Sequence, residues 1–111
     1  MSKTVNVNFT FNNNRYSNEV DVSFEGLLEL ATPDSLGVST IAIQARNADG
    51  DFETIQLVNN DLTVSALQFT VSSSVGYPYD ITSVFPAGVD VVRLDAGSAI
   101  TKTIVGTKRG V

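Results

Sequence analysis

The chain has 111 residues, a formal net charge of −5, and no cysteine, histidine or tryptophan. This length suits one domain, and a composition that is 42% hydrophobic and 17% charged favours a folded core over a disordered chain. Without cysteine or histidine the chain cannot build a disulfide, a Cys/His zinc site, or a nucleophile activated by an imidazole base. We therefore expect a single domain over residues 1–111 and no cofactor.

Polar and apolar residues alternate from the start of the chain. Residues 5–11 place valine and phenylalanine on one parity and asparagine and threonine on the other, which predicts a half-buried strand. The asparagines at 12–14 tolerate left-handed backbone angles and predict a turn. Residues 16–24 alternate again, so we expect the first two strands to pair as a hairpin.

The middle of the chain repeats this pattern. Residues 27–31 are compatible with one helical turn or with an irregular strand. Strands are expected at 38–45 and 52–58, joined by the Asn-Ala-Asp-Gly turn at 47–50.

The remaining residues continue as short strands and turns. Such strands, with turn signals between them and no strand–helix alternation, predict an all-β fold: an antiparallel β-sandwich or small barrel of about six to eight strands with little or no helix. The expected strands are 62–71, 89–94 and 99–105, with loops at 72–79 and 85–88 and a turn at 95–98.

The parity of the alternation also predicts which side chains are buried between the two sheets. The predicted core residues are Val7, Phe9, Val20, Val22, Ile41, Ile43, Ile55, Leu57, Leu67, Phe69, Val91 and Ile104.

The acidic turn at 47–53 is the first candidate for chemistry, because its oxygen ligands alternate around Gly50 as in calcium loops. Calcium needs six to eight oxygens, and the helix–loop–helix frame is missing, so a hairpin turn is favoured over a weak cation site. Asp49, Asp51 and Glu53 also have the spacing of a glycosidase pair, but no tryptophan is present to stack a sugar ring. We expect no metal site, no catalytic residue and no enzymatic activity.

The charge is distributed unevenly along the chain. Residues 1–18 and 96–111 carry five basic residues and no acid, whereas the twelve acidic residues lie between them. This pattern indicates either scattered solubility charge or a polar molecule whose basic ends meet an acidic partner. Five dispersed basic residues are too few for nucleic acid. The basic C-terminal segment contributes three candidate partner contacts: Lys102, Lys108 and Arg109.

Tyr77-Pro78-Tyr79 is the second candidate contact. Tyrosine offers a large amphipathic surface at low entropic cost, which suits a binding loop. The alternative is that both rings cover the open end of the sandwich.

Three further motifs occur along residues 38–109. Residues 41–55 form a strand, an Asn-x-Asp-Gly turn, an aromatic residue and a strand; 89–94 contain Val-x-x-Val-Arg; and 97–109 run from a Gly-Ser turn into a strand ending in basic residues. Together they resemble small β-sandwich proteins encoded among the structural genes of tailed phages, although Phe52 stands where tryptophan is usual. The resemblance implies a virion component, often a capsid decoration or head-accessory protein, without catalytic residues.

On this resemblance we expect a non-enzymatic virion structural protein of a tailed phage, a capsid decoration protein that binds the major capsid protein and forms homo-oligomers. The alternative is a carbohydrate- or host-surface-binding module of a fibre or tail, with Tyr77, Tyr79 and the asparagines at 12–14 as contacts. We expect no nucleic-acid, membrane or small-molecule partner. Residues 1–8 lack the apolar core of a signal peptide, so assembly in the host cytoplasm is expected.

Overall fold

The computed structural model describes residues 3–22, 26–86 and 88–110 and places them in β-strands joined by turns. Within these ranges no residue is helical, which confirms the expected all-β fold, and no helix could cross a membrane. The strands are β1 (Lys3–Thr10), β2 (Asn14–Tyr16), β3 (Val20–Asp21), β4 (Leu27–Ala31), β5 (Thr40–Arg46), β6 (Phe52–Thr54), β7 (Gln56–Val58), β8 (Val64–Ala66), β9 (Gln68–Thr70), β10 (Pro78–Asp80), β11 (Val91–Ile100) and β12 (Thr103–Gly110).

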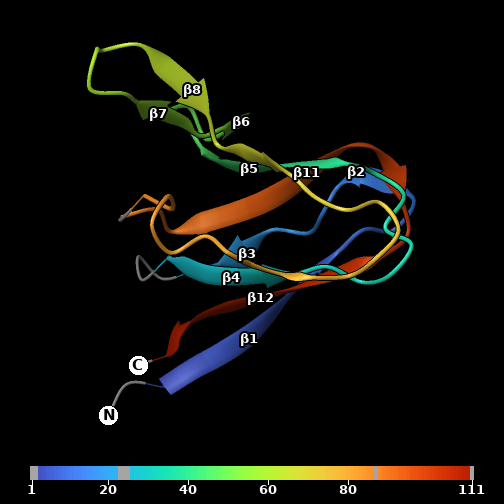
Figure 1. Ribbon diagram of the computed structural model, residues 1–111. Helices are drawn as coiled ribbons and strands as arrows, with labels where there is room; N and C mark the ends of the chain where they lie inside the picture. The colour runs from blue at the N-terminus through green and yellow to red at the C-terminus, as the bar shows by residue number, and fades with distance from the viewer. Residues whose placement is uncertain (1–2, 23–25, 87, 111) are drawn as a thin grey trace.

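The strands form two antiparallel layers, as expected for a β-sandwich. One sheet, called sheet A here, has the order β1-β12-β4-β10. The other, sheet B, has the order β2-β11-β5-β6, with β3 also beside β11 and β9 beside β5. Figure 1 shows sheet B above sheet A, and the separate β7–β8 hairpin projecting from the body of the domain.

The core lies between the two sheets and contains most of the predicted residues. Of the predicted set, Val7, Ile55, Leu57, Phe69 and Val91 are half-buried and the others are buried. Side chains outside the predicted set are buried as well: Phe11, Leu27, Leu30, Leu36, Val71, Ile81, Val92 and Leu94.

The parity predicted for β11 was wrong. Val91 is half-buried, whereas the buried side chains of this strand include Val92 and Leu94. Because successive side chains point to opposite faces, the observed parity turns Val91 and Arg93 outward. Burying Val91 instead would have carried the arginine into the core.

The predicted N-terminal hairpin was also wrong. β1 pairs with β12 along its whole length, from Lys3 opposite Gly110 to Thr10 opposite Thr103, whereas β2 and β3 pair with β11. The asparagine turn exists, with Asn13 at φ 52°, but it carries the chain from one sheet to the other. The Asn18 side chain fastens this crossing, since its Oδ1 accepts a hydrogen bond from Thr10 N at 2.6 Å.

Further expectations change in detail: the strand expected at 52–58 is divided into β6 and β7, and the loop expected at 72–79 contains the start of β10. The ambiguous segment 27–31 is strand β4, paired with β12 and β10. The turn expected at 95–98 lies within β11, where the pairing with β2 shifts register. Gly97 has φ +76°, and its N–H donates to the Asp95 carboxylate at 2.8 Å, so these turn residues form an irregularity inside a strand. Residues 23–25 of the predicted second strand and residue 87 of the predicted loop lie outside the described residues.

Candidate interaction surfaces

Tyr77 and Tyr79 lie at the edge of sheet A, on and beside β10. Tyr79 is half-buried; its hydroxyl accepts a hydrogen bond from Ser72 N at 2.9 Å, and its ring centroid lies 5.6 Å from that of Phe69. Tyr77 is 50% exposed and packs edge-on against Tyr79 at 6.3 Å. Tyr79 therefore closes the sandwich edge, while Tyr77 leaves a ring accessible to a partner.

The basic residues near the two ends of the chain do not form one cluster. The pairing of β1 with β12 sets Lys3 near Arg109 and Lys108, whereas Lys102 lies at the opposite end of the sheet, between β11 and β12. Lys108 is half-buried, and its Nζ donates to the carbonyl oxygen of Asp21 at 2.9 Å. The predicted contact role of these residues remains a prediction.

The acidic segment 47–53 forms the β5–β6 hairpin turn. The Asn47 side-chain oxygen accepts hydrogen bonds from Asp49 N at 2.9 Å and Asp51 N at 3.0 Å, and Gly50 has φ +89°. These bonds account for the turn residues without a cation. In the part of the chain that the structure describes, no three acidic side chains are grouped so that they could hold a metal ion.

The β7–β8 hairpin has a tight loop at its tip. Val58 pairs with Val64, and the loop between them is closed by hydrogen bonds from Asn59 N to Thr63 O at 2.8 Å and from Leu62 N to Asn59 O at 2.9 Å. Hydrogen bonds from the Thr63 hydroxyl and amide to the Asp61 carboxylate lower the pKa of Asp61. The loop is therefore an ordered turn.

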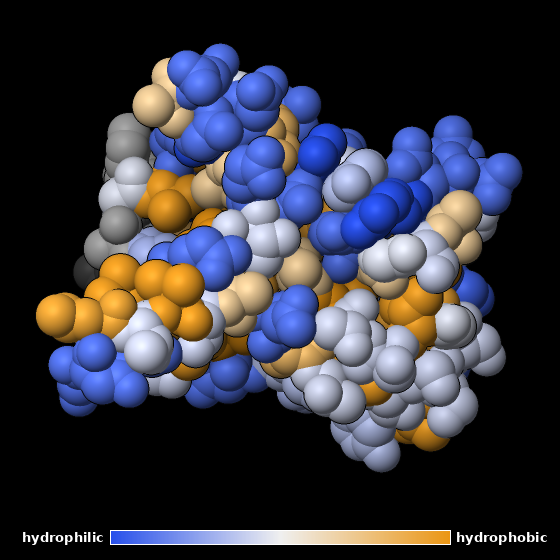
Figure 2. Space-filling view, turned by 90° about the horizontal axis from the view of Figure 1, so that it is seen from above, coloured by the Kyte–Doolittle hydropathy of each residue, from blue (hydrophilic) through white to orange (hydrophobic). Residues whose placement is uncertain are grey.

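Leu62, at the tip of this hairpin, has both an unusual backbone conformation and an exposed apolar side chain. Its φ of 70° lies in the left-handed region, at a loop position that glycine normally takes. Its side chain is also 82% exposed, beside Val58 and Val64, which are 69% and 60% exposed. Figure 2 shows hydrophobic side chains gathered at the end where this hairpin projects. Strain and exposed apolar surface at one place are typical of a contact site.

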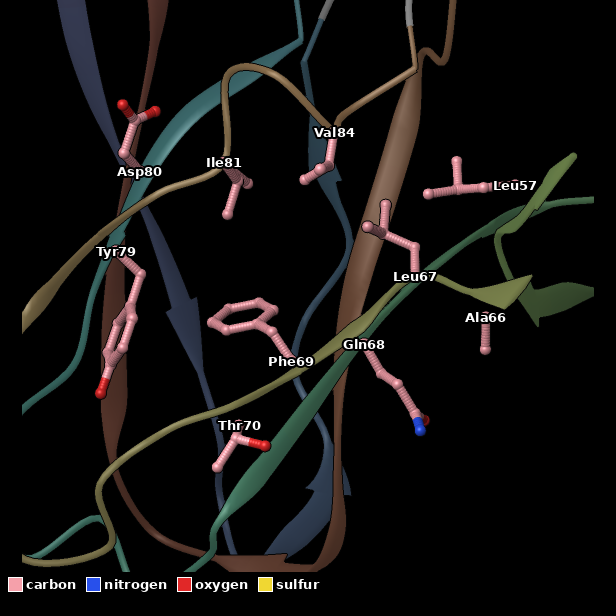
Figure 3. Close-up of a pocket in the computed structure, with 10 residues that line it drawn as sticks. All are labelled: Leu57, Ala66, Leu67, Gln68, Phe69, Thr70, Tyr79, Asp80, Ile81 and Val84. Atoms are coloured by element: carbon pink, nitrogen blue, oxygen red, sulfur yellow. The ribbon is translucent and has the colours of Figure 1, made fainter. Parts of the chain in front are cut away.

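An apolar cleft of about 360 Å³ opens at the base of the hairpin. It lies between β9 of sheet B and β10 of sheet A, where the two layers separate, and Figure 3 shows the neighbouring rings of Phe69 and Tyr79 among the side chains that line it. Leu57 and Val84 complete its apolar wall toward the hairpin. The cleft offers shape and apolar surface but few polar groups that could fix a small ligand.

Arginines and aromatic rings form a stack on the outer face of sheet B, called the arginine stack here. The guanidinium carbon of Arg93 lies 4.0 Å from the ring centroid of Tyr16 and 4.7 Å from that of Phe52. The guanidinium carbon of Arg15 lies 4.8 Å from the Tyr16 centroid. Arg93 Nε donates to Gln44 Oε1 at 2.7 Å. Four strands therefore contribute to the stack.

Asp95 anchors one end of the arginine stack. Its carboxylate accepts hydrogen bonds from Arg15 Nε at 3.0 Å and Arg15 Nη2 at 2.8 Å, and it also accepts one from Gly97 N. Burial raises the pKa of Asp95, but these hydrogen bonds and the charges of Arg15 and Arg93 outweigh burial, so the net pKa is lowered. Asp95 thus remains ionised and holds Arg15 in place.

Comparisons with known proteins identify the fold. No protein-family model and no curated protein sequence matches the chain. The structure of the SPBc2 prophage-derived protein YomS is similar, with a TM-score of 0.55 and 17% identity over 99% of this chain and 97% of that one. The PBSX exported protein XepA is similar with a TM-score of 0.54 and 17% identity, over 96% of this chain but 38% of XepA. The chain thus shares its fold with nearly the whole of the prophage-derived protein YomS and with part of XepA.

Proposed function

We propose that this protein is a non-enzymatic structural component of a tailed-phage particle, and that it decorates the capsid by binding the major capsid protein. The shared fold with YomS and XepA, and the hairpin and strand motifs described above, support a phage origin. In this proposal the protein acts as a homo-oligomer, is assembled in the host cytoplasm, and needs no cofactor, nucleic acid or membrane.

The tip of the β7–β8 hairpin carries this proposal. Leu62 is held in a left-handed conformation and exposes 82% of its surface, together with Val58 and Val64. Glycine at this position would relieve the backbone strain and remove the apolar side chain. A leucine in this conformation lowers the stability of the free protein. In this proposal leucine stands here because its side chain contacts the partner.

The test compares two variants on purified particles of the encoding phage. Leu62→Gly should lower the number of copies per particle while the melting temperature of the free protein stays the same or rises. Val75→Ala, which shortens a side chain that is 47% exposed outside the hairpin, is the matched control and should keep full occupancy. Equal occupancy of Leu62→Gly and the parent protein, or no protein on the particle, would contradict the proposal.

A host-surface or carbohydrate-binding module of a fibre or tail is the second candidate function, and the exposed ring of Tyr77 favours it. A glycan array of the parent and of Tyr77→Ala separates the two functions. Saccharide binding that is lost in the variant supports recognition. Copy number also discriminates, because decoration requires copies comparable to those of the capsid subunit, whereas a tail position requires only a few.

A further inference from the structure

Arg93 is held in place before any partner binds. It projects from β11, in the interior of sheet B, between the rings of Tyr16 at 4.0 Å and Phe52 at 4.7 Å. Its Nε donates to Gln44 Oε1 at 2.7 Å, which sets the rotation of the planar guanidinium. Much of the rotamer freedom that an arginine loses on binding is therefore already lost.

The bonding of Arg93 leaves one edge of its guanidinium unused. Gln44 occupies Nε, and within residues 3–22, 26–86 and 88–110 the terminal Nη1 and Nη2 atoms have no hydrogen-bond partner. These two nitrogens present parallel N–H groups, which match the two oxygens of a carboxylate in an end-on bidentate pair. Lysine cannot reproduce this geometry.

Arg93 also differs from its neighbours in charge pairing. Arg15 forms an ion pair with Asp95 at 2.8 Å, and Arg46 forms one with Asp90 at 3.2 Å. Among the described residues Arg93 has no such pair, although the chain carries a net charge of −5. The guanidinium of Arg15 contacts the same Tyr16 ring, but its charge is already paired with the Asp95 carboxylate, so Arg93 is the cation of the stack that lacks such a pair among the described residues.

We propose that Arg93 is the centre of a carboxylate-binding site that takes an aspartate or glutamate side chain of a partner protein. The Tyr16 ring is contacted by two guanidinium groups, which leaves little free aromatic face for a sugar ring. Arginine and aromatic residues together are instead typical of protein interfaces. Figure 2 looks onto this face and shows strongly hydrophilic side chains across its middle and the apolar hairpin at one end.

This inference deepens the proposed function and rests on it for the identity of the partner. An attachment surface made of the hairpin tip and Arg93 requires an apolar depression and an acidic side chain on the opposing protein. The basic ends of the chain were predicted to meet this acidic partner. The arginine stack has the better geometry, because Lys108 already donates to Asp21 O.

The test is a titration with poly-L-glutamate, followed by calorimetry and by backbone amide shifts of β2, β6 and β11. Because the protein is acidic overall, long-range charge opposes this probe, and binding reports a local site. Arg93→Lys should weaken binding by about tenfold, although its charge is kept. Arg46→Lys is the matched control on the same sheet and should bind like the parent. Phe52→Leu, which removes one ring of the clamp, should weaken binding to a smaller extent.

Several other outcomes would contradict the proposed carboxylate-binding site at Arg93. No binding by the parent, equal losses in Arg93→Lys and Arg46→Lys, or equal binding of polygalacturonate or inorganic phosphate would each contradict it. The melting temperature of Arg93→Lys checks that this variant is folded. If Arg93→Lys unfolds, Phe52→Leu takes its place as the test variant. A protein that occupies phage particles but does not bind poly-L-glutamate refutes the site alone. Arg93-dependent binding by a protein that is absent from particles refutes the proposed function alone.

Discussion

The Phe9 ring covers Gly106 in sheet A, and replacing the glycine tests this contact. Gly106 lies in β12 between Val7 of β1 and Leu30 of β4. A Cβ atom at Gly106 would lie 2.7 Å from Phe9 Cε2 and 3.1 Å from Val7 Cγ2. Both distances are well inside the 3.5–4.0 Å optimum for carbon atoms, so Gly106→Ala must displace the ring of Phe9 or the strands.

The sign of the effect distinguishes packing from backbone preference. In an unobstructed strand, alanine would stabilise the protein by roughly 0.5–1 kcal/mol relative to glycine. Overpacking of a well-filled core costs about 1–3 kcal/mol. We therefore expect Gly106→Ala to lower the free energy of unfolding by about 1–2 kcal/mol, measured by urea denaturation with circular dichroism.

A double-mutant cycle assigns the cost to Phe9. Phe9→Leu removes the clashing Cε2 atom, so in that background the penalty of Gly106→Ala should fall by about 1 kcal/mol. Gly50→Ala is the control, because Gly50 has φ +89° and no atom within 4 Å of its Cβ position. Its cost should come from the backbone alone and should add to that of Phe9→Leu. A stabilising Gly106→Ala, or a fully additive cycle with Phe9→Leu, would refute this account of the contact.

Three further predictions follow from burial and hydrogen bonding. Phe9→Ala should lower the free energy of unfolding by about 3–5 kcal/mol, whereas Phe69→Ala should lower it by about 1–2 kcal/mol, because Phe69 is half-buried beside the cleft. Equal losses for the two variants in urea denaturation would contradict this difference in burial. The pKa of Asp95 is lower in the folded chain than in the unfolded chain. The ionised Asp95 therefore stabilises the fold fully at pH values above its ordinary pKa of 3.8, and this stabilisation is lost as the pH falls below that value. Asp95→Asn should cost about 1–2 kcal/mol at neutral pH and should flatten this acid dependence in thermal melts. Tyr79→Phe should cost about 1 kcal/mol, since Ser72 N loses its acceptor; an unchanged melting temperature would indicate that water replaces it.

Local signals in the sequence predicted the features that depend on neighbouring residues. The β5–β6 hairpin formed where Asn47 and Gly50 indicated it, because the Asn47 side chain organises the turn and glycine supplies the positive φ. Alternation also identified Phe9, Ile41 and Ile104 as core residues. Such features are encoded within a few residues of the chain.

Features that depend on distant partners could not be predicted in the same way. The alternation in residues 5–11 and 16–24 fits a hairpin as well as it fits two strands in different sheets. The choice between them depends on β12 and β11, far along the chain. Gly97 likewise has the signature of a turn, and only its register with β2 shows that it lies inside a strand.

The interaction surfaces also depend partly on neighbouring residues and partly on distant ones. Leu62 was expected to begin a strand over 62–71, but it lies in the loop before β8, and its left-handed conformation depends on how that loop closes. The arginine stack combines Tyr16, Phe52 and Arg93 from three strands, so no local motif could indicate it. Tyr77 was identified as a candidate from its local sequence, but its position at the sheet edge depends on hydrogen bonds between its backbone and Thr32, earlier in the chain.

The pairing of β1 with β12 also constrains the order of folding. Each contact in this ladder closes a loop of roughly 90 to 110 residues, so its entropic cost is met only after the rest of the domain has brought the strands together. During synthesis, β1 leaves the ribosome before β12 and has no partner in sheet A until residues 103–110 follow. Its apolar side chains, Phe9 among them, stay available to other chains throughout that interval. Slow translation of the last strand should therefore increase aggregation more than an equal delay in the middle of the chain.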